Sequence, residues 1–198
     1  MPRFLAALFF IVLVACTSTN QFSDADAIIS ETEWSNEQIL NILSDRLFVY
    51  DLEIKDKSIN EVSLTIEYYK DGEPEGDAQW FSTPVNEQDQ ANDLTIAYVQ
   101  QTFNETDERW VLAIMDENGF GSSKLENNWP KDREEELGAI WGDVSLPLDL
   151  TKGEKTVVGF LVYSSSSVIS SPARIETEED LQKLVDAEYA YVLSIEVK

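Results

Sequence analysis

From Leu47 onward, hydrophobic residues recur mostly at every second position, and this period constrains the fold more than any other feature. In residues 62–69 and 140–150 the apolar side chains occupy the even positions, which is typical of half-buried β-strands. Two further segments, 110–115 and 157–163, are apolar at both parities. They predict central strands that are covered on both faces.

Four more segments have strand character, which gives about eight short strands in total. Turn signals such as Asp71-Gly72 separate these strands. Capping-box spacing predicts two short helices, one from Ser35 with Gln38 and one after Thr177 with Asp180. The chain is therefore expected to be mainly β: an antiparallel β-sandwich of immunoglobulin-like or jelly-roll-like type with two short helices. The four additional strand segments are 47–55, 78–82, 94–103 and 189–197.

The composition excludes most catalytic chemistry. Among 198 residues there is no histidine and one cysteine, so a Ser-His-Asp triad, a His/Cys zinc site and a disulfide framework all lack their residues. The net charge of -24 argues against nucleic acid as a partner. No glycine-rich phosphate loop or serine–lysine motif occurs, and no cofactor is predicted. An enzyme would have to use carboxylates, and 38 acidic residues make any chosen pair uninformative.

The N-terminus predicts export. Arg3 precedes an unbroken apolar run over residues 4–15. As a helix, this run reaches only about 18 Å, against about 30 Å for a bilayer core. Residues 1–15 are therefore expected to be a signal peptide. The alternative is a buried N-terminal helix.

The end of this run, Leu13-Val14-Ala15-Cys16, resembles the lipobox of bacterial lipoproteins. The resemblance implies cleavage before Cys16, lipid on Cys16, and anchoring in the cell envelope. Because Thr17 is not the aspartate that marks inner-membrane retention, the lipoprotein pattern implies the outer membrane, facing the periplasm, or the outer leaflet of the plasma membrane in a Gram-positive source. The alternative is an ordinary cleavage region. Residues 16–33 are then expected to be a flexible acidic tether, and residues 34–198 a single β-sandwich domain.

The connection over residues 116–137 contains a weak candidate for a metal site. Asp116, Asn118 and Ser122 stand at positions 1, 3 and 7 of an EF-hand-like loop. Other ligand positions of that loop carry unsuitable residues. A hairpin turn through residues 117–119 accounts for the same pattern, and we favour it.

Trp129 and Trp141 are candidates for a ligand platform. If both project outward, their rings can stack on sugars. The alternative, which we favour from the sequence, is that Trp129 pins its loop to the core and covers Trp141.

We expect a membrane-anchored envelope lipoprotein that acts as a non-enzymatic binding or structural module, with an envelope protein or glycan as its partner. The alternative is a carboxylate-based hydrolase or carbohydrate-binding domain that acts on envelope or extracellular polysaccharide.

Overall fold

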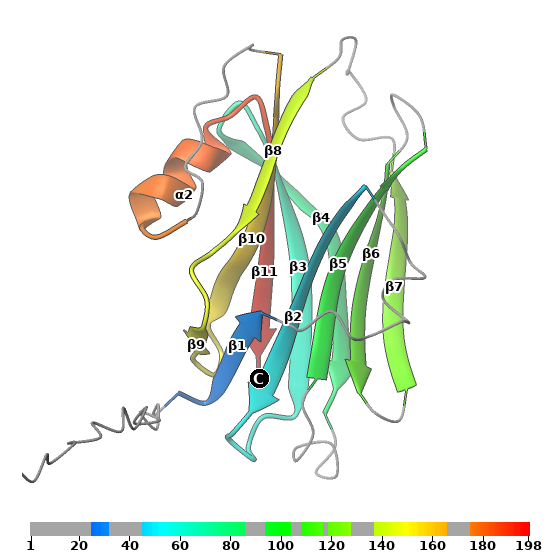
Figure 1. Ribbon diagram of the computed structural model, residues 1–198, viewed down its shortest axis with the longest axis vertical. Coiled ribbons are helices and arrows are strands. Elements are labelled where there is room, and N and C mark those ends of the chain that lie inside the picture. The colour runs from blue at the N-terminus through cyan, green and yellow to red at the C-terminus, as the bar shows by residue number, and fades with distance from the viewer. Residues whose placement is uncertain are drawn as a thin grey trace, which may run out of the picture.

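The described part of the chain consists of two antiparallel β-sheets and one helix (Figure 1). The computed structural model describes residues 25–31, 45–85, 94–103, 108–116, 119–127, 137–165 and 175–198. In spatial order, the first sheet contains β7 (Gly119–Asn127), β6 (Glu108–Asp116), β5 (Leu94–Thr102), β2 (Arg46–Ile54), β1 (Ala27–Glu31) and β9 (Leu148–Leu150). The second sheet contains β4 (Glu73–Pro84), β3 (Glu61–Lys70), β11 (Tyr189–Val197), β10 (Lys155–Ser164) and β8 (Gly138–Asp143). The prediction of a mainly β, antiparallel chain is confirmed.

One hydrophobic core joins the two sheets. Alternate residues of each strand point into it, as the period of two predicted, so that Tyr98 of β5 and Leu193 of β11 belong to the same cluster. The hydroxyl of Tyr98 also donates a hydrogen bond of 2.6 Å to the backbone carbonyl of Ser194 in the opposite sheet. The sheets are thus linked by a directed bond as well as by apolar packing.

The strands that are apolar at both parities are covered on both faces, as predicted. On β6, Trp110 points into the shared core, whereas Val111 is buried in a second cluster on the opposite face of the first sheet. On β10, Leu161 points into the core and Phe160 packs with Leu184 of α2 (Glu178–Val185) on the outer face of the second sheet. The predicted capping box of α2 is present, because Thr177 and Asp180 bond each other's backbone N–H groups. No helix among the described residues is long and apolar enough to cross a membrane.

Three boundaries differ from the sequence predictions. Strand β1 lies in the range assigned to the flexible tether, and that assignment is wrong for these residues because Ala27 and Ile29 are fully buried between β2 and β9. Residues 140–150 do not form one strand: after β8 the chain bends through residues 145–147, around a cis Leu146–Pro147 bond, and β9 joins the other sheet. The connection expected over residues 116–137 contains β7. The helix predicted from Ser35 lies outside the described residues.

Candidate functional site

Four polar side chains meet inside one end of the core, at the upper end in Figure 1, where β2 and β6 begin and β5 and β10 end. Arg46, Gln100, Glu108 and Tyr163 each stand two residues from a core residue of the same strand, so they point between the sheets. Gln100, Glu108 and Tyr163 are buried, and Arg46 is half-buried. We call these four residues the polar end cluster.

Hydrogen bonds connect all four members of the polar end cluster. The hydroxyl of Tyr163 donates to Oε1 of Glu108 at 2.8 Å and accepts from Nε2 of Gln100 at 2.7 Å. Nε2 of Gln100 also donates to Oε2 of Glu108 at 2.7 Å. Nη1 of Arg46 donates to Oε1 of Gln100 at 2.6 Å and to the hydroxyl of Tyr163 at 3.1 Å. Each residue therefore fixes the orientation of the others.

The environment keeps the Tyr163 hydroxyl protonated. Burial raises its pKa well above the ordinary value, the negative charge of Glu108 raises it further, and Arg46 opposes the shift. Tyr163 is therefore a neutral donor to Glu108 at physiological pH. Glu108 is the one buried acid among the residues whose side chains are described, and both of its oxygens accept a hydrogen bond within the cluster.

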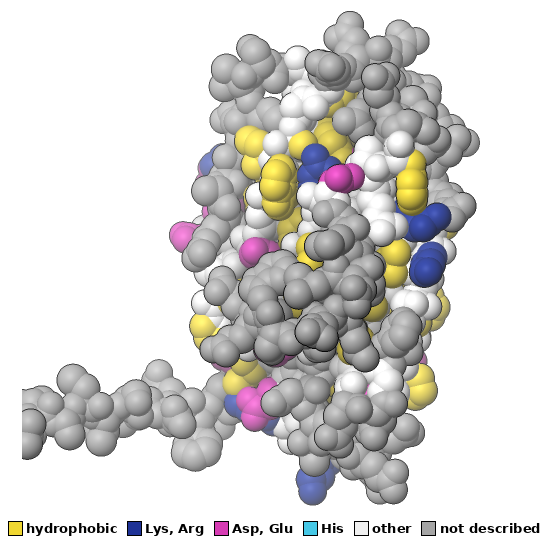
Figure 2. Space-filling view, turned by 45° about the vertical axis from the view of Figure 1, so that its right-hand side comes forward, with side chains coloured by type: hydrophobic (Ala, Val, Ile, Leu, Met, Phe, Trp, Pro, Cys, Tyr) yellow, Lys and Arg dark blue, Asp and Glu magenta, His cyan; other side chains and the backbone are white. Residues whose placement is uncertain are grey.

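Trp141 lies at the solvent-facing rim of this cluster. It pairs with the core residue Leu161, so it stands on the core-facing side of β8, but β8 is an edge strand and the side chain is 51% exposed. The guanidinium of Arg46 lies 5.1 Å from the centroid of the Trp141 ring and 5.2 Å from that of Tyr163. One face of the indole is thus held by a cation that the cluster itself orients. Figure 2 shows exposed hydrophobic side chains beside basic ones on one face of the molecule.

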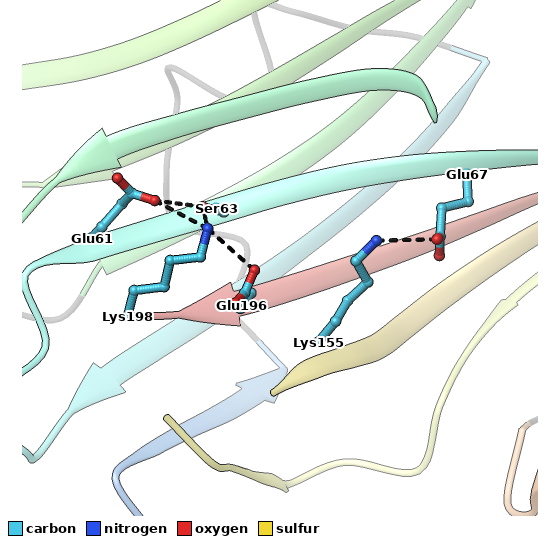
Figure 3. A network of polar contacts seen from close by, with 6 residues as sticks. All are labelled: Glu61, Ser63, Glu67, Lys155, Glu196 and Lys198. Carbon is cyan, nitrogen blue, oxygen red and sulfur yellow. Dashed lines mark hydrogen bonds and ion pairs between the residues drawn. The ribbon is translucent and has the colours of Figure 1, made fainter. Parts of the chain in front are cut away.

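A second polar network lies on the outer face of the second sheet (Figure 3). Nζ of Lys198 lies 3.3 Å from a carboxylate oxygen of Glu61 and 3.2 Å from one of Glu196, and Lys155 pairs with Glu67 at 3.1 Å. The hydrogen bonds that Lys198 donates, first to the Glu196 carboxylate and then to that of Glu61, raise the pKa of Lys198. All five side chains are partly exposed, so these pairs add little to stability.

The candidate ligand platform is found only in part. The preferred expectation that Trp141 is covered is wrong, since half of its surface is exposed. Trp129 lies outside the described residues, as do Asn118 and Cys16. A second exposed tryptophan, Trp80 on the other edge strand of the same sheet, pairs with Thr65 and lies on the face away from the core.

Of the three candidate calcium ligands, Asp116 and Ser122 are described, and the pairing of β6 with β7 on either side of the favoured turn places these two apart. Asp116 pairs with Gly119 across the turn between β6 and β7, and its carboxylate accepts the backbone N–H of Gly119 at 2.8 Å. Ser122 pairs with Ala113, three steps further along the ladder, so its hydroxyl is not brought to Asp116. Within the part of the chain that the structure describes, no group of three or more His, Cys, Asp or Glu residues could hold a metal ion.

Sequence reasoning missed the polar end cluster. Gln100 and Glu108 stand at core-facing positions of β5 and β6. The available signal was therefore a polar residue where the alternation predicts an apolar one. That signal is weak in a strand end, where polar residues are expected in any case. Only the pairing of β2 with β5 and β5 with β6 brings Arg46, Gln100 and Glu108 to the same end of the sheet.

These features define a domain of two antiparallel sheets whose shared core ends in a buried polar cluster with an exposed tryptophan at its rim. The family model that matches the chain covers residues 28–197 and is that of the YgaN domain. The chain therefore belongs to the YgaN domain family. Comparison with curated proteins and with solved structures gives no match.

Proposed function

We propose that the chain is a lipid-anchored protein of the bacterial cell envelope whose domain binds a glycan without catalysis. The observation that carries the binding half is the position of Trp141: its indole is half exposed, and Arg46 holds one face of the ring. A ring fixed in this way loses little conformational freedom on binding, so more of the contact energy appears as affinity. The opposite face of the indole offers apolar area to the C–H groups of a sugar ring.

The anchoring half rests on Cys16. The signal segment and the lipobox-like Leu13-Val14-Ala15-Cys16 precede the YgaN domain, which begins at residue 28 in the family match. Acyl chains on Cys16 give durable attachment only in combination, because a single chain binds a membrane reversibly. Thr17 favours the outer membrane, facing the periplasm, in a Gram-negative source. In a Gram-positive source the same anchor lies in the outer leaflet of the plasma membrane.

We also propose a specific architecture for the domain, a β-sandwich. Two antiparallel sheets that share one core support a β-sandwich, of the immunoglobulin-like or jelly-roll-like type expected from the sequence. Domains of this architecture place ligand-binding residues at the ends and edges of their sheets, which is where Trp141 lies.

The arrangement favours binding over hydrolysis. A carboxylate-based glycosidase uses two carboxyl groups on either side of the scissile bond, one of them an acid that is free to transfer a proton. Glu108 instead receives hydrogen bonds from Gln100 and Tyr163 on its two oxygens. This carboxylate serves to orient the cluster.

Two matched variants test the glycan site. Purified full-length protein in detergent is mixed with insoluble cell-wall glycan and with insoluble polysaccharides, and the fraction that co-sediments is measured. Trp141→Ala should weaken binding about tenfold, because it removes a stacking contact worth about 1 kcal/mol or more. Trp80→Ala removes an equally exposed tryptophan on another face and should leave binding unchanged. Equal loss in both variants, or no binding by the unmodified protein, would reject the proposal.

A separate experiment tests the anchor. Cys16→Ser in the full chain should move the protein from the membrane fraction to the soluble fraction and abolish incorporation of a labelled fatty acid. A Cys16→Ser protein that stays with the membrane and carries label would exclude lipidation at this residue.

A further inference from the structure

Asp143 lies beside Trp141 on the edge strand β8. The two residues are two positions apart, so their side chains stand on the same face of the strand, with Cα atoms about 6.7 Å from each other. Trp141 is 51% exposed and Asp143 is half-buried. A carboxylate and an aromatic ring are therefore neighbours on one accessible edge of the second sheet.

The carboxylate of Asp143 is held by Tyr50 of the opposite sheet. The buried hydroxyl of Tyr50 donates to Oδ1 of Asp143 at 2.5 Å and also lies 2.9 Å from the backbone carbonyl of Val158. Gly159 pairs with Asp143 in the ladder, and a Cβ at this glycine would lie 2.9 Å from the Tyr50 hydroxyl. The absence of a side chain at Gly159 therefore gives Tyr50 its access to Asp143. Burial, followed by the negative charge of Asp143, raises the pKa of Tyr50 well above its ordinary value, so its hydroxyl remains a donor.

Arg46 and Asp143 lie on opposite sides of Trp141 along β8. Arg46 bonds Tyr163, whose partner on β8 precedes Trp141 by two residues. Tyr50 follows Arg46 by four residues on β2 and bonds Asp143, which follows Trp141 by two residues. The order along the strands is thus cation, indole, carboxylate. The face of the indole that is turned away from Arg46 is turned toward Asp143.

These two side chains determine which chemical groups a ligand must present. The indole offers apolar area to the C–H face of a sugar ring. An ionised carboxylate only accepts hydrogen bonds, and its two oxygens have about four acceptor positions, so the bond from Tyr50 leaves capacity for others. Adjacent hydroxyl groups at the edge of a sugar ring are suitable donors, and bonds to a charged acceptor are the stronger kind. An anionic group at the same place would be repelled by Asp143.

We propose that Trp141 and Asp143 form one subsite for a neutral glycan, in which the indole stacks on a sugar ring and Asp143 accepts hydrogen bonds from adjacent hydroxyls of that ring. This inference rests on the proposed glycan-binding function and names its ligand class. Tyr50 is a positioning residue of the subsite, because it orients Asp143 without touching the sugar. Glycans whose stacked ring carries a carboxylate or phosphate are excluded.

Calorimetric titration of the full-length protein, in a detergent without a sugar head group, tests the ligand class. The neutral probes are oligosaccharides of glucose and of N-acetylglucosamine. The comparison probes are the same oligosaccharides with O-methylated ring hydroxyls, which keep the C–H face and lose the donors, and oligosaccharides of glucuronic acid, which add a negative charge. We expect a neutral probe to bind about tenfold tighter than either comparison probe.

Three variants test the residues. Asp143→Asn should weaken binding of the neutral probe about tenfold and reduce its advantage over the O-methylated and acidic probes. Tyr50→Phe should weaken binding of the neutral probe and leave that of the O-methylated probe unchanged, which a merely structural role would not do. The matched control is Glu75→Gln, which removes an exposed acid from β4, the opposite edge strand of the same sheet, and should change neither affinity.

Each other outcome gives a definite answer. If Trp141→Ala weakens binding and Asp143→Asn does not, the glycan-binding function stands and the contact with Asp143 is rejected. If Asp143→Asn weakens binding of all probes equally, its effect is structural and the subsite is rejected. Tighter binding of glucuronic acid oligosaccharides would overturn the neutral class. If neither neutral probe binds, the subsite is rejected, whereas co-sedimentation with insoluble glycan still decides the proposed function.

A direct measurement covers the case in which Asp143→Asn does not fold. In the unmodified protein, the carbon-13 NMR signal of the Asp143 carboxyl group, assigned through its own backbone, should shift when a neutral oligosaccharide binds. The corresponding signal of Glu75 should not move. An unchanged Asp143 signal at saturation would reject the contact.

Discussion

The guanidinium of Arg46, in the first sheet, lies over the indole of Trp141, in the second sheet, at 5.1 Å from the ring centroid. The same guanidinium donates to Gln100 and Tyr163 and lies 5.2 Å from the Tyr163 ring. One side chain therefore joins both sheets, the buried hydrogen bonds and the exposed aromatic surface. Its substitution should affect stability and the orientation of Trp141 together.

Arg46→Lys should lower the free energy of unfolding by about 1–2 kcal/mol, because an ammonium group cannot reproduce the planar stacking and the forked hydrogen bonds of a guanidinium. Urea denaturation followed by far-UV circular dichroism measures the change. The matched control is Arg109→Lys, in which the lost cation–π contact involves the exposed ring of Phe103 at 4.6 Å. This control should cost less than about 0.5 kcal/mol. An equal loss of unfolding free energy in the two variants would show that the contribution of Arg46 to stability does not come from the buried cluster.

Tyr163→Phe should destabilise the domain by about 2–3 kcal/mol, since it leaves Glu108 without one donor and Arg46 and Gln100 without a shared acceptor. Tyr98→Phe is the graded comparison. Its hydroxyl makes one bond, to the carbonyl of Ser194, and its loss should cost about 1 kcal/mol. Chemical denaturation of both variants shows which one loses more unfolding free energy. A larger loss for Tyr98→Phe would contradict the stabilising role of the network around Tyr163.

Gly159→Ala should destabilise the core by about 1–3 kcal/mol through overpacking. A Cβ at this position would lie 2.9 Å from the hydroxyl of Tyr50 and 3.1 Å from Cδ1 of Phe48. The Tyr50 hydroxyl cannot move freely, because it bonds Asp143 and the carbonyl of Val158. Gly119→Ala is the control, since nothing lies within 4 Å of its Cβ. Thermal melts should show a clear fall for the first variant and little change for the second.

Thr177→Ala should cost about 0.5–2 kcal/mol by removing the N-cap of α2. It should also alter the response to acid. The hydrogen bond from the Thr177 hydroxyl, the largest contribution, lowers the pKa of Asp180. The stabilisation from Asp180 is therefore complete above its unfolded pKa of about 3.9 and is lost as the pH falls through its lower folded value. Melts between neutral pH and strong acid should show a smaller acid loss in the variant, and parallel curves would contradict this coupling.

Three buried tyrosines should resist ionisation until the protein unfolds. Burial raises the pKa of Tyr50, Tyr98 and Tyr163 above the ordinary value of about 10. Because each pKa is higher in the folded state, the associated stability is complete below about pH 10 and is lost as the pH rises through the folded values. Near-UV absorbance of tyrosinate, recorded with circular dichroism, should show their ionisation coinciding with loss of structure. Ionisation of all seven tyrosines before any loss of structure would contradict the burial.

The sequence predicts the elements whose local signal agrees with their tertiary role. The alternation in residues 62–69 and the two-sided apolar runs in β6 and β10 correspond to the strands observed, and the capping box identifies α2. Strand β1 was missed because its two buried positions are flanked by acidic and polar residues. Strand β7 was missed because glycines and serines replace the usual β-branched residues where it lies beside Phe81.

The candidate site was less predictable than the fold. The exposure of Trp141 depends on β8 being an edge strand, and strand order is not encoded in the alternation of one segment. The polar end cluster combines residues from β2, β5, β6 and β10, which the sequence separates by up to 117 positions. No local pattern carries that information.

The place of β1 in the first sheet limits how far the domain can extend from a lipid anchor at Cys16. If Cys16 carries the lipid, the covalent chain between the anchor and Ala27 can extend at most about 40 Å, against about 60 Å if the free segment ran to residue 33. The reach of Ala27 from the membrane is then about a third shorter. A glycan that the domain holds must come within that reach plus the distance from Ala27 to the binding site. Lengthening the segment before Ala27 should extend the capture distance without changing the affinity of the domain.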